Sequence, residues 1–218
     1  KLFDVTECPV LDPRLEAALP AFRRELAHEI SGNVDAMVDV GGAAVLGRSA
    51  SPFAQPSLAA ERALVACALQ ALPRAPAHVV ELFAGAGTFT VPLLERGHTV
   101  DAYEGDPATV RRLRELAPGA KAVRADLLRV AAAFDFGPAA AVLLDPPRAG
   151  AAPCLAAIAA TGAPVVVYVS CAPMTLFRDL RTLGELGYDV EWVQPFDAFP
   201  QTPHVECVVR CVRRPIVG

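Results

Sequence analysis

From residue 78 onward, short runs rich in β-branched residues alternate with helical segments, and this alternation restricts the folds open to the chain. Strands are expected at 78–83, 98–103, 120–124, 140–144 and 164–169, with helices near 87–96, 107–117 and 151–160. Such an alternation builds a parallel sheet covered by helices. A further helix at 174–186 and two strands at 188–195 and 205–212 predict a terminal hairpin whose last strand lies antiparallel. We therefore expect an α/β fold with a Rossmann-like, doubly wound, mostly parallel sheet of seven strands.

The first 56 residues have a different pattern and predict a small N-terminal appendage of helical and β pieces. Apolar residues form a helical stripe over 12–30, and 31–56 is rich in Gly, Ser, Pro and Ala, with β-like pieces at 37–40 and 43–46. Another helix is expected from about 58 to 72. We expect residues 1–56 to form the appendage and residues 57–218 to form the main domain.

Composition narrows the classes of function. No run of about 18 uncharged apolar residues and no signal-peptide pattern is present, so we expect a cytoplasmic protein without a membrane partner. The six cysteines are scattered and form no CxxC pair, which predicts reduced thiols and no metal site. The net charge of −4 argues against a free-standing nucleic-acid binder, although an enzyme whose RNA-binding part lies in another domain agrees with it. No obligate protein partner is evident.

The motif Ser170-Cys171-Ala172-Pro173 follows the most apolar run of the chain, at 164–169. Open α/β sheets place their chemistry at the carboxyl ends of such strands. Pro173 suits the first position of a helix, and a thiol near a helix N-terminus has its thiolate stabilised by free N–H groups. Cys171 is therefore a candidate nucleophile. A small buried core residue is the alternative, and position alone favours neither.

Glycines mark the end of the first regular strand, where residues 81–90 read ELFAGAGTFT. Gly85 and Gly87 allow the backbone to approach a ligand at a helix N-terminus. The pattern E-x-x-x-G-x-G resembles the first motif of class I S-adenosylmethionine (SAM) methyltransferases, and an ordinary tight turn is the alternative. Glu104, at the end of the next strand, is placed to bind two ribose hydroxyls. Asp126 is placed to accept from an adenine amino group, although a solvated carboxylate is equally compatible.

The motif Asp145-Pro146-Pro147-Arg148 ends the fourth expected strand. The two prolines stiffen the turn and direct the Asp145 carboxylate into the cleft. Enzymes that methylate exocyclic amines have an aromatic residue at the position of Arg148, so this motif disfavours that reaction. A purely structural turn is the alternative.

Together these motifs resemble the catalytic domain of the RNA uracil-C5 methyltransferases, which make 5-methyluridine in ribosomal and transfer RNA. The matching segments occur in the family's order: FAQ at 53–55, ELFAGAGTFT, YEG at 103–105, LLDPPRAG at 143–150, YVSCAPMTLFRDL at 168–180 and FPQTPHVECVV at 199–209. The resemblance implies the class I methyltransferase fold, SAM as the cofactor and an RNA substrate, rRNA or tRNA, with a single-stranded or flipped uridine.

The resemblance also implies roles for individual residues. Cys171 is the nucleophile that adds to C6 of uracil, Glu206 is the base that removes the C5 proton, and Asp145 belongs to the catalytic group. Cys8 resembles a family iron–sulfur ligand, but one thiolate cannot hold a cubane cluster, so no cluster is expected. The expected cofactor-binding residues are Gln55, Phe83, Gly85, Gly87, Thr88, Glu104, Asp126 and Asp145.

Two other classes of function agree with the same motifs. One is a SAM methyltransferase that acts on a small molecule or a protein, with Cys171 as a structural residue. The other is a non-catalytic SAM-binding module. SAM binding is common to all three, so dependence on Cys171 is the property that separates them.

Overall fold

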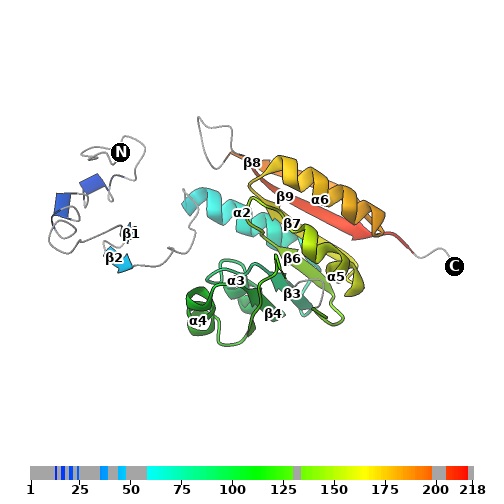
Figure 1. The fold of residues 1–218 in the computed structure, drawn as a ribbon, viewed down its shortest axis with the longest axis horizontal. Helices are drawn as coiled ribbons and strands as arrows, with labels where there is room; N and C mark the ends of the chain where they lie inside the picture. The colour runs from blue at the N-terminus through cyan, green and yellow to red at the C-terminus, as the bar shows by residue number, and fades with distance from the viewer. Residues whose placement is uncertain are drawn as a thin grey trace. The chain divides into compact units, whose positions relative to one another are not determined.

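The structure is a computed structural model, which describes residues 13, 16, 17, 20, 21, 24, 35–38, 44–47, 58–129, 134–197 and 205–215. Its main sheet contains seven strands: β3 (His78–Leu82), β4 (Thr99–Glu104), β5 (Lys121–Arg124), β6 (Ala141–Leu144), β7 (Val165–Ser170), β8 (Tyr188–Phe196) and β9 (Glu206–Arg213). Their spatial order is β5-β4-β3-β6-β7-β9-β8 (Figure 1).

Pairing in this sheet is mostly parallel. β3 pairs in parallel with β4 on one side and β6 on the other, and β5 and β7 extend the sheet in parallel beyond them. β9 lies antiparallel between β7 and β8. The expected seven-stranded sheet and the antiparallel last strand are therefore confirmed. The strand order reverses at β3, so the carboxyl ends of β3 and β6 flank the switch point at which doubly wound sheets bind ligands.

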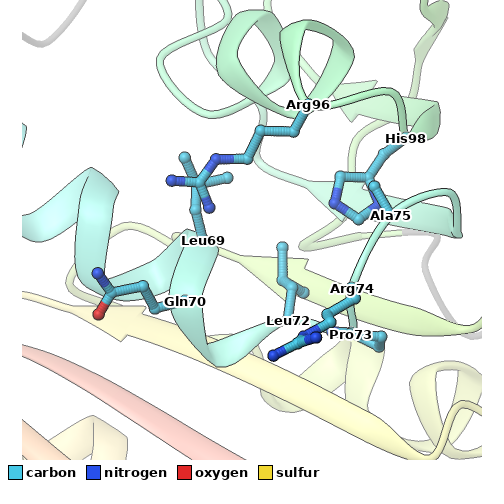
Figure 2. A pocket seen from close by; sticks show the side chains of 8 residues that line it. All are labelled: Leu69, Gln70, Leu72, Pro73, Arg74, Ala75, Arg96 and His98. Carbon is cyan, nitrogen blue, oxygen red and sulfur yellow. The ribbon is translucent and has the colours of Figure 1, made fainter.

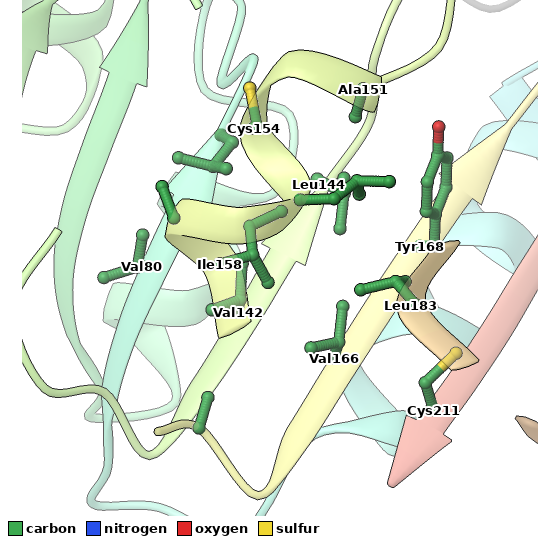
Figure 3. Packing of buried hydrophobic residues seen from close by; sticks show 14 of the residues in the cluster. Val80, Val142, Leu144, Ala151, Cys154, Ile158, Val166, Tyr168, Leu183 and Cys211 are labelled. Atoms are coloured by element: carbon green, nitrogen blue, oxygen red, sulfur yellow. The ribbon is translucent and has the colours of Figure 1, made fainter. Parts of the chain in front are cut away.

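Helices cover both faces of the sheet, because the parallel strands are apolar on both sides. Leucines of α2 (Leu58–Ala71), α3 (Thr90–Glu95) and α4 (Pro107–Leu116) pack in the cluster that includes Val79, Leu143 and Val167. On the opposite face, α5 (Leu155–Ala160) and α6 (Pro173–Glu185) pack in the cluster that includes Val80 and Tyr168 (Figure 3). The expected helix at 87–96 begins only at Thr90, because residues 85–89 form turns. A 3₁₀ turn, η2 (Ala152–Cys154), precedes α5.

Contacts divide the chain into two units, Lys1–Phe53 and Ala54–Gly218. In the first unit, β1 (Asp35–Val38) and β2 (Ala44–Gly47) form an antiparallel pair. Most of the expected helix at 12–30 lies outside the described residues, and the expected boundary after residue 56 stays a prediction. No helix in the described part of the chain has both the length and the hydrophobicity that a membrane crossing requires.

Candidate active site

Strand register brings the expected nucleophile and base to the same edge of the sheet. Ser170, the last residue of β7, is opposite Cys207 of β9. Cys171 and Glu206 therefore lie next to this pair, at the carboxyl end of β7. Leu144 of β6 is in register with Tyr168, so Asp145 follows β6 at the same edge. Three residues that are far apart in sequence are thus brought together by two strand pairings.

Four charged or ionisable groups interact at this edge. Burial raises the pKa of the Cys171 thiol, and the Glu206 and Asp145 carboxylates raise it further. The Arg148 side chain acts in the opposite direction and lowers the pKa of the thiol. Arg148 also lowers the pKa of Glu206, whose net shift is nevertheless upward because of burial.

The thiolate stabilisation expected from the helix N-terminus is not found. Cys171 precedes Ala172, the N-cap residue of α6, and the Ala172 N–H donates to Ser170 Oγ at 3.1 Å. Desolvation therefore dominates the pKa of Cys171, and the expectation of a lowered thiol pKa was wrong. In this structure Arg148 is the group that favours the thiolate.

Three carboxyl groups form a chain of electrostatic interactions from the centre of the sheet to the thiol. Glu81 of β3 is fully buried, and its Oε2 accepts from Thr90 Oγ1 at 2.6 Å. Burial raises the pKa of Glu81 to about 8, with a further contribution from Asp145. Burial and the charge of Glu206 raise the pKa of Asp145 to about 7. Among the described residues, Glu206 Oε1 and Glu81 Oε1 are buried without a hydrogen-bond partner.

On the cofactor side, Glu104 is held by backbone donors. Its Oε2 accepts from the Gly85 N–H at 3.0 Å, and its Oε1 accepts from the N–H groups of Gly105 and Asp106 at 2.7 and 2.9 Å. Gly85 has φ +56°, and a Cβ built there would meet no atom within 4 Å. Phe83 has φ +60°, a conformation that is strained for a non-glycine residue and is typical of ligand-binding loops.

A hollow of about 530 Å³ is lined by Gly105, which directly follows Glu104 in the sequence, and by Arg124, Ala125 and Asp126. Asp126 Oδ1 accepts weakly from the Leu128 N–H at 3.3 Å, and the side chain remains 54% exposed. Its Oδ2 lies 3.6 Å from Arg129 Nε in a surface ion pair, and the exposed carboxylate retains lone pairs that can accept hydrogen bonds from a group in the hollow. Arg124 lines the same hollow and was not anticipated from the sequence.

The remaining expected residues differ in how the structure places them. Phe83 is half-buried and packs against the core cluster of α5 and α6, whereas Thr88 is exposed in the turn before α3. Gln55 and Cys8 lie outside the described residues. Sequence reasoning did not assign a role at the thiol to Arg148, and it did not identify Glu81 as a titrating group. Both stand inside motifs that it had singled out.

A second hollow, of about 350 Å³, lies away from this edge (Figure 2). It is lined by residues near the C-terminal ends of α2 and α3, including Arg74, Arg96 and His98. Helix C-termini carry partial negative charge, which favours cationic side chains at this position. The arginines therefore have a structural explanation there, and this hollow is not part of the candidate site.

The sheet order, the glycine turn after β3 and the acidic residue that ends β4 define the class I methyltransferase fold. A crystal structure of the tRNA (uracil-54, C5)-methyltransferase of Pyrococcus abyssi, in complex with S-adenosyl-L-homocysteine, has a TM-score of 0.64 and 28% identity. The match covers 73% of this chain and 40% of the archaeal chain. A putative RNA methyltransferase from Pyrococcus horikoshii has the same fold, with a TM-score of 0.58 at 19% identity over 73% of this chain and 84% of its own.

Sequence comparisons specify the family. A profile described as tRNA (Uracil-5-)-methyltransferase matches residues 124–214. The 23S rRNA (uracil(1939)-C(5))-methyltransferase RlmD of Pseudomonas fluorescens is 39% identical over 164 residues, and RlmD of Alkalilimnicola ehrlichii is 43% identical over 173. These matches cover 72% and 74% of this chain but 36% and 38% of the relatives, so the chain spans well under half of their length. The chain belongs to the RNA uracil-C5 methyltransferase family.

Proposed function

We propose that this chain is the catalytic part of a SAM-dependent methyltransferase that modifies C5 of uridine in RNA, rRNA or tRNA. The observation that carries the proposal is the pairing of Ser170 with Cys207, which puts a thiol and a buried carboxyl at one sheet edge. A structural cysteine would not need Asp145, Arg148 and Glu206 around it. Family membership supports the same reaction.

Cys171 and Glu206 have complementary tasks in this proposal. The Cys171 thiolate forms a bond to C6 of uracil, which moves the C5–C6 electron pair into an enolate and makes C5 nucleophilic. Once C5 carries the methyl group, Glu206 takes the C5 proton, its electron pair re-forms the C5–C6 double bond, and the C6–S bond breaks to release the Cys171 thiolate. Burial raises the pKa of Glu206, which makes its carboxylate a stronger base. Asp145, with a pKa of about 7, is suited to receive the thiol proton.

The residues on the cofactor side fit SAM. Three backbone N–H groups fix the orientation of Glu104, and its Oε2 retains acceptor capacity for a ribose hydroxyl. The open space above Gly85 admits the ligand, and the hollow at Asp126 suits an adenine ring. When bound, SAM supplies the electrophilic methyl group that C5 receives. We propose Phe83, Thr88, Gly87 and Gln55 as further contacts, on the family resemblance alone.

RNA as the partner and the cytoplasm as the compartment are parts of the same proposal. The described cysteines are free thiols, which supports a reducing environment.

The test is the intact mass of the protein after incubation with SAM and an RNA oligonucleotide that contains 5-fluorouridine. Fluorine at C5 prevents the deprotonation step, so an RNA–protein adduct should accumulate. Cys171→Ala should abolish the adduct, and Cys67→Ala, a half-buried thiol on α2, should retain it. SAM binding without any adduct would contradict the proposal and would favour a different substrate or a non-catalytic SAM-binding module.

A further inference from the structure

The loop between β6 and η2, residues 145–151, carries both Asp145 and Arg148, and α6 holds its backbone at several points. Thr175 Oγ1 lies 3.0 Å from the Arg148 carbonyl oxygen and 3.1 Å from the Ala172 carbonyl oxygen, and its one proton is shared between these two acceptors. Arg178 Nη2 donates to the Ala149 carbonyl at 2.9 Å. The Ala151 N–H donates to Asp179 Oδ2 at 2.6 Å. The first two turns of α6, which follow Cys171 directly, therefore fix the backbone on both sides of Gly150.

Asp179 is the centre of this arrangement and is fully buried. Besides the Ala151 N–H, its Oδ2 accepts from the Tyr168 hydroxyl at 2.7 Å. Its Oδ1 accepts from Arg178 Nε and Nη2 at 2.9 and 2.8 Å. Figure 3 shows the Tyr168 ring among the core side chains, with its hydroxyl at the edge of the cluster. A buried carboxylate with four donors is rigid, because each alternative orientation leaves charge unpaired in the core.

Gly150 shows how closely the loop and the helix approach each other. A Cβ built on Gly150 would lie 2.5 Å from both Asp179 Oδ2 and Arg178 Nη2, and the residue has φ +79°. Both side-chain atoms are held by hydrogen bonds, so neither moves aside freely. Only glycine fits this contact, and the loop has a single position relative to α6.

Arg148 is the residue that this loop presents to the reacting groups. Its carbonyl oxygen lies 3.0 Å from Thr175 Oγ1, one helical turn after Cys171, and its charge lowers the pKa of both Cys171 and Glu206. We propose that Asp179 is a positioning residue for the reaction: it acts with Thr175 and Arg178 to fix the backbone that places Arg148 beside Cys171 and Glu206. The role in catalysis rests on the proposed function, whereas the effect on the Cys171 thiol does not.

The proposed connection runs from Asp179 to Cys171, and different charged and titratable groups surround these two residues. Arg148 and Asp145 act on Cys171 from the loop 145–151, and Glu206 acts on it from β9. Tyr168 and Arg178 contact Asp179 from β7 and α6, and the Cys154 thiol of η2 senses its charge. None of the groups around Asp179 acts on Cys171 directly, so a variant of Asp179 is expected to reach the thiol through the loop 145–151, which carries Arg148 and Asp145.

The test is the pH dependence of Cys171 alkylation by iodoacetamide, followed by mass spectrometry of its peptide with fragmentation to separate Cys154. Arg148→Gln should move the midpoint upward by about one pH unit, since an adjacent opposite charge shifts a pKa by about that much or more. Asp179→Asn should move it upward by about half a unit. Because Asp179→Asn alters a buried site, Thr175→Val serves as a second variant at a partly exposed position and should shift the midpoint in the same direction.

The decisive comparison repeats both changes in the Arg148→Gln background, where neither should add a shift if they act through Arg148. Arg181→Gln is the matched control on α6, because its partner is Glu185 at the surface, and it should leave the midpoint unchanged. Unchanged midpoints in both positioning variants, or equal shifts with and without Arg148, would overturn the proposal. The measurement needs neither RNA nor SAM, so failure to trap 5-fluorouridine RNA would count against the proposed function alone.

Discussion

The catalytic edge of the sheet has a cofactor half, around Glu104, and a substrate half, around Cys171 and Glu206, and the carboxyl groups of the two halves have opposite surroundings. On the cofactor half, Glu104 accepts three backbone N–H groups at 2.7 to 3.0 Å. On the substrate half, Glu206 is 1% exposed, and its Oε1 has no hydrogen-bond partner among the described residues. Burial raises the pKa of both Glu206 and Asp145 on that side.

This difference separates binding from proton transfer. A carboxylate fixed by N–H donors keeps one orientation, which suits the recognition of a ribose hydroxyl. Desolvation raises the pKa of a carboxyl and makes its carboxylate a stronger base, which suits proton abstraction. The same side chain type therefore performs two kinds of work within one sheet edge, and its surroundings decide which.

The largest expected effect comes from removing the base on the substrate half. Glu206→Gln should lower turnover on unmodified RNA by about 10² to 10⁴, the usual contribution of general base catalysis. Because the C5 proton then stays in place, a methylated RNA–protein adduct should accumulate and be visible by intact mass. Glu191→Gln, on β8 and partly exposed, is the control and should turn over normally. Rapid release of product by Glu206→Gln would assign the proton abstraction to another group.

A change on the cofactor half should affect binding instead. Glu104→Ala should weaken SAM binding about tenfold to a hundredfold, because a hydrogen bond to a charged acceptor is lost. Isothermal titration with SAM measures this directly, and Asp101→Asn on the same strand is the control, since its partner Lys121 lies at the surface. If Glu104→Ala bound SAM normally, the ribose would have to be recognised elsewhere.

The sheet was predictable from sequence to within a residue or two, and most directly at its centre, where β3, β6 and β7 coincide with apolar runs that are buried on both faces. The helix at 90–95 was predicted too long, because the turns around Gly85 and Gly87 delay its start. Proximity of Cys171 and Glu206 depends on the pairing of Ser170 with Cys207, which no local pattern encodes. The direction of the Cys171 pKa shift follows from burial and from the Glu206 and Asp145 carboxylates, which outweigh Arg148 and surround the thiol only in the folded chain.

Glu81 lies on β3, on the cofactor half, but burial raises its pKa as it raises the pKa of Asp145 and Glu206 on the substrate half. Its pKa of about 8 exceeds the ordinary 4.5, so between these values the folded chain holds a proton that the unfolded chain has released. The free energy of unfolding therefore falls as pH rises through this window. Glu81→Gln should make the free energy of unfolding less dependent on pH. At pH 8.5 the variant should be more stable than the unchanged chain by about 2 kcal/mol, as measured by urea unfolding, and this difference in free energy should shrink towards pH 5. Parallel pH profiles for the two chains would show that Glu81 is ionised in the fold.

The smallest effect distinguishes two glycines of the cofactor loop. Gly85 has φ +56° and open space at its Cβ position, so Gly85→Ala should cost about 1 kcal/mol of unfolding free energy for the left-handed conformation alone. Gly87 has φ +106°, and its added Cβ would lie 3.2 Å from Leu113 Cδ1 and 3.5 Å from Val91 Cγ2. Gly87→Ala should therefore cost about 2–3 kcal/mol, because backbone strain and crowding add. Urea unfolding of the two variants measures both values. Equal losses of unfolding free energy in the two variants would show that the loop relaxes around Gly87. The fixed orientation of Glu104 would then depend on its backbone N–H donors alone.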